Sequence, residues 1–115
     1  MIFIIEDDDL MAECIQKSCG HHETRIFHDA YAAIGAMNGR LPDLIFLDIL
    51  LSGPDGFTFL NEIASYTDTA AIPIVIVSSL DFTGKDLTPY GVVGAINKDS
   101  MVPKEIETYV KRYTH

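Results

Sequence analysis

The stretch IFIIEDDD, residues 2–9, runs four bulky apolar side chains directly into four carboxylates. An apolar run without alternation indicates a strand buried on both faces, because a half-exposed strand alternates apolar and polar residues. Carboxylates packed this closely repel one another and push at least one pKa upward. The stretch therefore predicts a buried strand that ends at a site of concentrated negative charge.

Further segments of the chain have the composition of strands. The predicted strands after the first are a weak one at 23–27, the strongest at 43–48 (DLIFLD), and two more at 72–78 (IPIVIVS) and 92–97 (VVGAIN). Most of these runs are continuously apolar and lack the period of two that marks a sheet with one solvated face. They are predicted to lie side by side in a buried sheet.

The segments between these strands are predicted to be helices. Asp8 or Asp9 can cap the first helix and Asp29 the second, while residues 57–66 and 102–113 carry the periodicity of two more. The stretch DFTGKDLTPYG, residues 81–91, is a poor helix because glycine and proline interrupt it. Strands that alternate with helices predict one α/β domain over 1–115, with a parallel sheet covered by helices on both faces.

Composition excludes several classes of partner. The net charge of −9 and the pI near 4.6 argue against a nucleic-acid-binding surface and against anionic membranes. No apolar run approaches the roughly 18 residues that a membrane span requires, and no signal-peptide pattern opens the chain. Cys14 and Cys19 form no CxxC motif and are interpreted as reduced cysteines of one helix. These features predict a cytoplasmic protein.

Polar side chains follow the predicted strands where ligands bind in open parallel sheets, at the carboxyl ends. The residues at these ends are Glu6, Asp7, Asp48, Ser78 and Lys98. A divalent cation relieves the repulsion among three carboxylates, and a site with few protein ligands suits Mg²⁺ better than Ca²⁺. Lys98 is a point charge for a phosphoryl oxygen and Ser78 a hydrogen-bond donor to another, so Asp48 can be the nucleophile that accepts a phosphoryl group.

Four quoted segments, taken in order, resemble the receiver domain of bacterial two-component response regulators. They are IFIIEDDD, LIFLDILLSGPDGF, IPIVIVSS and GVVGAINK, which match the acidic first-strand ending, the phosphoacceptor strand and loop, the Thr/Ser strand and the lysine strand of that family. The resemblance covers the whole chain. It implies a flavodoxin-like three-layer sandwich whose five-stranded parallel sheet has the order 2-1-3-4-5.

The resemblance also implies a role for each residue at the edge of the sheet. Asp48 is expected to take phosphate from a phosphohistidine on a sensor histidine kinase or a histidine phosphotransfer protein. Asp7 is expected to bind Mg²⁺ directly, Glu6 through water, and Leu50 through its backbone carbonyl, while Ser78 and Lys98 contact the phosphoryl group. A downstream protein target or output domain is the expected recipient of the signal, a homodimer is compatible with it, and no enzyme activity beyond self-phosphorylation and self-dephosphorylation is expected.

The chain departs from the family pattern at two positions near the lysine. An aromatic residue usually stands three before the lysine and swings inward on phosphorylation, but that position is Ala95. A proline usually follows the lysine, but that position is Asp99. These departures favour, as the alternative function, a receiver-like binding module that signals without phosphorylation.

A phosphatase or a flavin carrier on the same layout is a third class of function. An aspartyl-nucleophile phosphatase usually has a second acid two residues after the first, where this chain has Leu50. A flavin carrier needs a hydroxyl-rich phosphate loop after the first strand, where this chain has EDDD.

In the receiver family, Leu50 and Leu80 occupy positions that flank the water that hydrolyses the aspartyl phosphate, so slow hydrolysis is expected.

Overall fold

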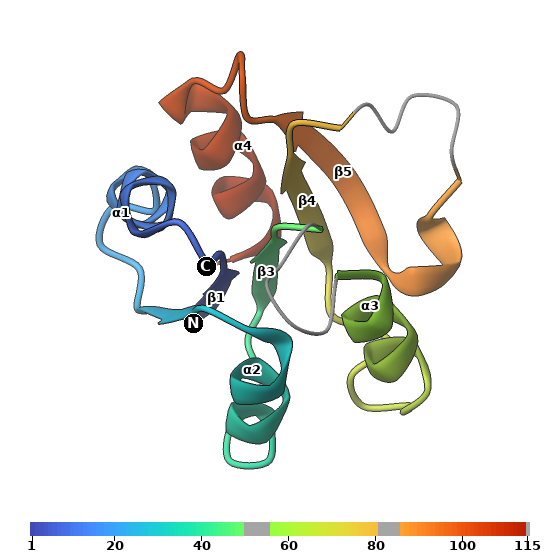
Figure 1. Cartoon of the computed structure of the whole chain (residues 1–115). Helices are drawn as coiled ribbons and strands as arrows, with labels where there is room; N and C mark the ends of the chain where they lie inside the picture. The colour runs from blue at the N-terminus through green and yellow to red at the C-terminus, as the bar shows by residue number, and fades with distance from the viewer. Residues whose placement is uncertain (50–55, 81–85, 115) are drawn as a thin grey trace.

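The computed structural model describes residues 1–49, 56–80 and 86–114, in which strands and helices alternate along the chain (Figure 1). The strands are β1 (Ile2–Ile5), β2 (Thr24–Phe27), β3 (Leu44–Leu47), β4 (Ile74–Ser78) and β5 (Val92–Asn97). The helices are α1 (Asp9–Ser18), α2 (Ala30–Met37), α3 (Gly56–Ala64) and α4 (Pro103–Tyr113), with a 3₁₀ turn, η1, at Thr88–Tyr90. The predicted strands and four of the predicted helices are thus present, with ends that differ by a few residues.

The five strands form one parallel sheet in the order β2-β1-β3-β4-β5, which confirms the predicted fold class. In this register Ile5, the last residue of β1, lies opposite Phe27 on one side and Leu47 on the other. The residues that follow β1 and β3 therefore emerge next to each other at the carboxyl edge.

Each face of the sheet has its own apolar core, because the side chains of a strand point alternately to the two sides. Phe3, Ile5 and Leu47 pack on the face covered by α2 and α3. Ile4 and Phe46 pack on the opposite face, against α1 and α4. Strands β1, β3 and β4 are buried along their whole length, as the absence of alternation predicted.

Two aspartates begin the first two helices as predicted. The side chain of Asp8 accepts hydrogen bonds from the backbone N–H groups of Leu10 and Met11, so Asp8 rather than Asp9 is the N-cap of α1. Asp29 accepts from the N–H of Ala32 at the start of α2. Such caps satisfy backbone donors that have no partner within the helix.

Gly56 is needed for close packing at the start of α3. A Cβ at this position would lie 2.6 Å from the Cα of Ile49. The absence of a side chain therefore lets α3 approach the chain just beyond β3.

The poor helix predicted over 81–91 is only the 3₁₀ turn η1 in its described part, and residues 81–85 lie outside the described ranges. Gly91 ends the turn with a φ of 82°, a left-handed conformation that favours glycine. Within the described residues the longest helix is α4, with 11 residues, and none is long and apolar enough to cross a bilayer.

Candidate functional site

Three carboxylates meet at the carboxyl edge of the sheet. Glu6 and Asp7 follow β1, and Asp48 follows β3; one oxygen from each lies within 4.8 Å of the others. The backbone N–H of Asp48 donates to the carbonyl of Ile5 at 2.9 Å, which continues the ladder between β1 and β3 and holds the two acidic segments together. Glu6 and Asp48 are only 1% and 5% exposed, whereas Asp7 is exposed.

Lys98 reaches this cluster from the end of β5. Its Nζ lies 2.6 Å from Oε1 of Glu6 and donates to Oδ2 of Asp48 at 3.1 Å. Its side chain is 17% exposed, so the ion pairs are largely shielded from water. Lys98 thus places one positive charge between two buried negative charges.

Ser78 ends β4, the strand between β3 and β5. It is buried, and its carbonyl accepts from the backbone N–H of Lys98 at 3.0 Å. Its Oγ accepts from the N–H of Leu80 at 3.2 Å, which leaves the hydroxyl proton of Ser78 to be donated elsewhere. All five polar residues named from the sequence lie at one edge of the sheet; Leu50 lies outside the described residues.

The pKa of Glu6 is raised from 4.5 to about 7, and burial of the carboxylate is the largest cause. The Lys98 ammonium lowers this pKa, whereas the nearby Asp48 carboxylate adds to the increase. The sequence predicted an increase from repulsion, but loss of hydration is the larger cause. For Lys98, burial lowers the pKa, yet the contacts with Glu6 and Asp48 outweigh it and the pKa is raised.

The Glu6–Lys98 contact was not predicted, because the sequence interpretation directed Lys98 only at a phosphoryl group. Glu6 is further held through its Oε2, which accepts from the backbone N–H of Asp8 at 3.2 Å. A signal for this pairing was present in the sequence, since an acid that directly continues a fully buried strand needs a nearby cation.

The donor set fits a hard divalent cation. The three carboxylates offer only oxygen ligands, close enough together to share one ion, and among the described residues they form the single group of this kind. Oε1 of Glu6 is buried, and apart from the Lys98 ammonium at 2.6 Å it has no hydrogen-bond partner among the described residues. Water bound to a cation would supply a further donor to this oxygen.

The raised pKa of Glu6 predicts a pH dependence of stability in metal-free buffer. Between about pH 4.5 and 7 the folded protein keeps a proton on Glu6 that the unfolded chain releases, so stability falls as the pH rises through this window. The free energy of unfolding should drop by roughly 2–3 kcal/mol from this group. Urea unfolding in EDTA across this range measures the drop.

The Glu6→Gln variant should lose most of this slope, because glutamine does not titrate. Glu13→Gln, at an exposed position of α1, is the matched control and should keep the slope of the parent. Equal slopes for parent and Glu6→Gln would contradict the assignment of the raised pKa to Glu6.

Comparison with known proteins identifies the relatives of this chain. The family model described as the response regulator receiver domain matches residues 2–111. Protein-glutamate methylesterase/protein-glutamine glutaminase 2 of Chromobacterium violaceum is 25% identical over 119 residues. That alignment covers 99% of this chain and 33% of the methylesterase, so the chain spans about a third of that relative's length.

Solved structures show the same architecture. The receiver domain of NtrX from Brucella abortus superposes with a TM-score of 0.84 and 27% identity, covering 98% of this chain and 97% of that one. The phosphorylated cyanobacterial phytochrome response regulator RcpA superposes with a TM-score of 0.75 and 28% identity, covering 96% of this chain and 88% of that one.

Proposed function

The chain belongs to the response regulator receiver domain family of two-component systems, and from that premise we propose that Asp48 is its phosphoacceptor. The observation that carries the proposal is the contact between Lys98 Nζ and Asp48 Oδ2, at 3.1 Å, beside the Glu6 and Asp7 carboxylates. A carboxylate with an ammonium and a cluster of oxygen ligands at hand has the surroundings that a phosphoryl group requires.

In the proposed reaction, a carboxylate oxygen of Asp48 attacks the phosphorus of a phosphohistidine on a partner protein. The new O–P bond forms as the N–P bond breaks, and the imidazole leaves with the electron pair and takes up a proton from water. Lys98 then shifts its contact from the free carboxylate to a phosphoryl oxygen, and the hydroxyl of Ser78 donates to another. The protein thus positions and stabilises charge, while the donor supplies the bond energy.

Mg²⁺ would be held by Asp7 and Asp48, and by Glu6 through water. The backbone carbonyl of Leu50, a residue outside the described ranges, would complete the set of ligands. The ion would neutralise charge on the phosphoryl oxygens during transfer. Lys98 already balances part of the charge on Glu6 and Asp48, and Asp7 is the exposed member of the cluster.

The partners follow from the same proposal. The donor is a sensor histidine kinase or a histidine phosphotransfer protein, and the recipient of the signal is a downstream protein target or output domain. Residues 1–115 act as one receiver domain in the cytoplasm, and a homodimer is compatible with this role. We do not propose the methylesterase activity that the name of the Chromobacterium relative gives, because the chain aligns with only a third of that protein.

A receiver-like module that signals without phosphorylation is the second candidate. It is favoured by Ala95, which has no aromatic ring to report the state of Asp48, and by the reduction of the predicted fourth helix to η1 in its described part. In that case the acidic cluster and Lys98 would be a structural ion-pair network.

Acetyl phosphate with Mg²⁺, followed by intact-mass spectrometry, separates the two candidates. The phosphoacceptor proposal predicts the gain of one phosphoryl group per chain, and no gain when EDTA replaces Mg²⁺. A protein that stays unmodified under conditions in which a known receiver domain is phosphorylated would favour the second candidate.

The lifetime of the aspartyl phosphate should be controlled in part by Leu80. Leu80 is 47% exposed just beyond β4, its backbone N–H donates to the Oγ of Ser78, and its side chain has no group that can orient water. Leu80→Glu should accelerate loss of phosphate by about tenfold, below the 10²–10⁴-fold typical of general base catalysis.

Leu41→Glu, at an exposed loop position, is the control, and its phosphorylated form should lose phosphate at the rate of the parent. A Leu80→Glu protein no faster than the parent would show that this side chain does not govern the water.

A further inference from the structure

A groove of about 200 Å³ lies between α2 and α3, the two helices that cover one face of the sheet (Figure 1). The apolar part of its lining consists of Ile34 and Met37 of α2 and Ile63 of α3, which are buried or half-buried. The polar part of the lining is an amide, an aromatic ring and two carboxylates, which belong to Asn38, Tyr66, Glu62 and Asp68. The groove thus has an apolar floor and a negatively charged rim.

Both helices end at this groove. Met37 is the last residue of α2, and Ile63 is the next to last residue of α3. The end of a helix carries a partial negative charge, because its last carbonyl groups have no partners within the helix. The helices between parallel strands run opposite to those strands, so the groove lies at the amino end of the sheet, away from the acidic site.

No basic residue of α2 or α3 offsets the negative charge of these two helix ends. The last turn of α1 contains a lysine and that of α4 a lysine and an arginine, whereas the last turns of α2 and α3 contain no basic residue. Arg40 follows α2 closely, but its guanidinium is held by the Glu23 carboxylate at 2.9 and 3.1 Å. Glu62 instead adds a negative charge to the end of α3, where an acid is unfavourable.

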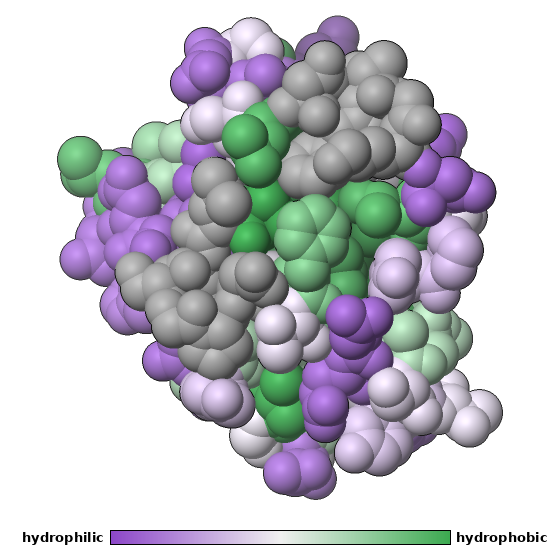
Figure 2. All heavy atoms as spheres, turned by 45° about the vertical axis from the view of Figure 1, so that its right-hand side comes forward, coloured by the Kyte–Doolittle hydropathy of each residue, from purple (hydrophilic) through white to green (hydrophobic). Residues whose placement is uncertain are grey.

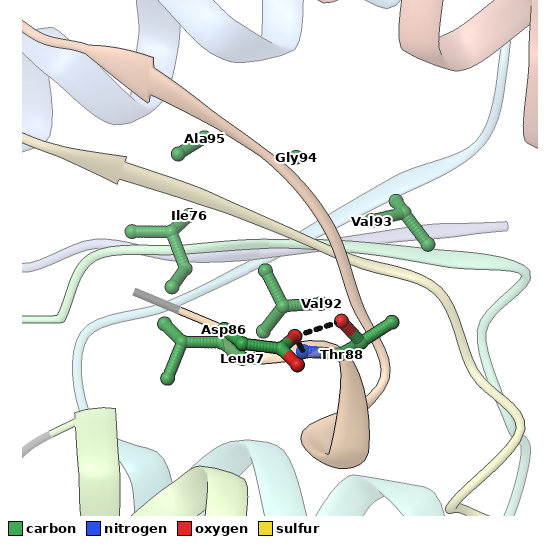
Figure 3. A pocket seen from close by; sticks show the side chains of 8 residues that line it. All are labelled: Ile76, Asp86, Leu87, Thr88, Val92, Val93, Gly94 and Ala95. Carbon is green, nitrogen blue, oxygen red and sulfur yellow. Dashed lines mark hydrogen bonds between the residues drawn. The ribbon is translucent and has the colours of Figure 1, made fainter. Parts of the chain in front are cut away.

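The two carboxylates of the rim are available to an external cation. Among the described residues, neither Glu62 nor Asp68 receives a side-chain hydrogen bond or an ion pair. The groove beside β5 is different, because its carboxylate, Asp86, accepts hydrogen bonds from the N–H and the hydroxyl of Thr88 (Figure 3). Figure 2 shows apolar residues gathered in the middle of that other face.

The turn after α3 fixes the aromatic side of the groove. The hydroxyl of Thr69 donates to the carbonyl of Ile63 at 2.6 Å, and the N–H of Ala70 donates to the carbonyl of Tyr66 at 2.8 Å. The side chain of Tyr66 is 56% exposed, so a ligand can reach its ring. A guanidinium group stacks on aromatic rings and pairs with carboxylates through two hydrogen bonds, whereas an ammonium group is a point charge without this planar fork.

We propose that the groove between α2 and α3 binds an arginine side chain of a partner protein, with the guanidinium group beside Glu62, Asp68 and Tyr66. The methylene groups of an arginine can cover the apolar floor while its charged head stays at the rim. The groove is smaller than the ~300–1,000 Å³ of most small-molecule sites, so it fits one long side chain rather than a cofactor. No basic residue is among its described lining, so the carboxylate of a free amino acid would find no partner there.

The amide of N-acetyl-arginine tests this chemistry, because it carries the side chain without charged termini. It is titrated at low ionic strength into isotope-labelled, unphosphorylated protein, and backbone amide shifts are mapped. The expected result is weak, saturable binding in the millimolar range, with shifts centred on residues 34–38 and 62–69. The citrulline analogue has nearly the same shape but no charge, and it should bind at least about fivefold more weakly.

Removing the two carboxylates assigns the binding to the rim. The double variant Glu62→Gln, Asp68→Asn should reduce the preference for the arginine probe over the citrulline probe to less than about twofold. The double variant Glu13→Gln, Glu107→Gln is the matched control, since it removes two exposed acids from α1 and α4, which cover the opposite face. It should keep the preference of the parent.

Glu62→Lys places a cation from the chain itself in the groove. It should abolish saturable binding of the arginine probe. At low ionic strength it should also raise the melting temperature of the free protein by about 2–5 °C, because a lysine in the last turn of α3 offsets the negative helix end. A variant that lost binding by misfolding would melt at a lower temperature instead. Tyr31→Ala, at the other end of α2, is expected to bind like the parent, whereas Tyr66→Ala should bind about threefold more weakly.

Several results would overturn the proposal. They are shifts centred elsewhere, equal binding of the arginine and citrulline probes, or binding that survives Glu62→Lys. Free arginine that binds more tightly than the capped probe would make the groove a site for a free amino acid, and self-association that Glu62→Lys abolishes would make a second copy of the chain the occupant. The groove shares no residue with the acidic site, so failure of these titrations leaves the Asp48 proposal standing, and the reverse also holds.

Discussion

Asp48→Asn protein should gain no phosphoryl group from acetyl phosphate and Mg²⁺ under conditions that modify the parent fully. Asparagine has nearly the same shape as aspartate, but its amide is not a nucleophile that forms an acyl phosphate. Lys98 keeps its ion pair with Glu6 when the charge of Asp48 is removed, so the fold should be retained. The expected loss is therefore complete and chemical in origin.

Two further measurements make the assignment of Asp48 specific. Asp68→Asn, a substitution of the same type at an exposed position, should be phosphorylated like the parent. Circular dichroism and thermal unfolding of Asp48→Asn should show a folded protein. Stoichiometric phosphorylation of Asp48→Asn would move the acceptor to another carboxylate and end the proposal for Asp48.

Mg²⁺ should raise the melting temperature of the parent, and Asp7→Ala should lose that rise. A ligand that binds only the folded state stabilises it by RT ln(1 + [L]/Kd), which is about 2.7 kcal/mol at a hundredfold excess over Kd. Asp7 is the exposed member of the cluster and has the most direct access to an ion from solvent. Removing it should therefore abolish most of the metal-induced stabilisation.

The same variant should behave oppositely without metal. In EDTA, Asp7→Ala should be more stable than the parent, because one of three mutually repelling carboxylates is gone. Glu13→Ala removes an exposed acid of α1 and should keep the full response to Mg²⁺. An unchanged rise in melting temperature for Asp7→Ala would show that the ion binds elsewhere. Thermal scans of the three proteins over a Mg²⁺ series decide the matter.

Local sequence patterns were sufficient to predict the architecture. Continuous apolar runs such as LIFL are stable only when both faces are buried, and helices between them impose parallel pairing with right-handed crossovers. The caps at Asp8 and Asp29 follow from local hydrogen bonding and were predictable from short range alone. The gathering of Glu6, Asp7, Asp48, Ser78 and Lys98 at one edge followed from topology, because parallel strands end on the same side.

How these groups interact could not be predicted from local patterns, because it depends on the packing of the whole domain. Register brought Lys98 to within 2.6 Å of Glu6 and 3.1 Å of Asp48, and packing buried Glu6 deeply enough to raise its pKa to about 7. The exposure of Ala95 likewise depends on which elements pack against β5, and it is absent from the local pattern. The physical reason is that distance and dielectric environment depend on residues far apart in the chain, whereas periodicity and capping depend on neighbours.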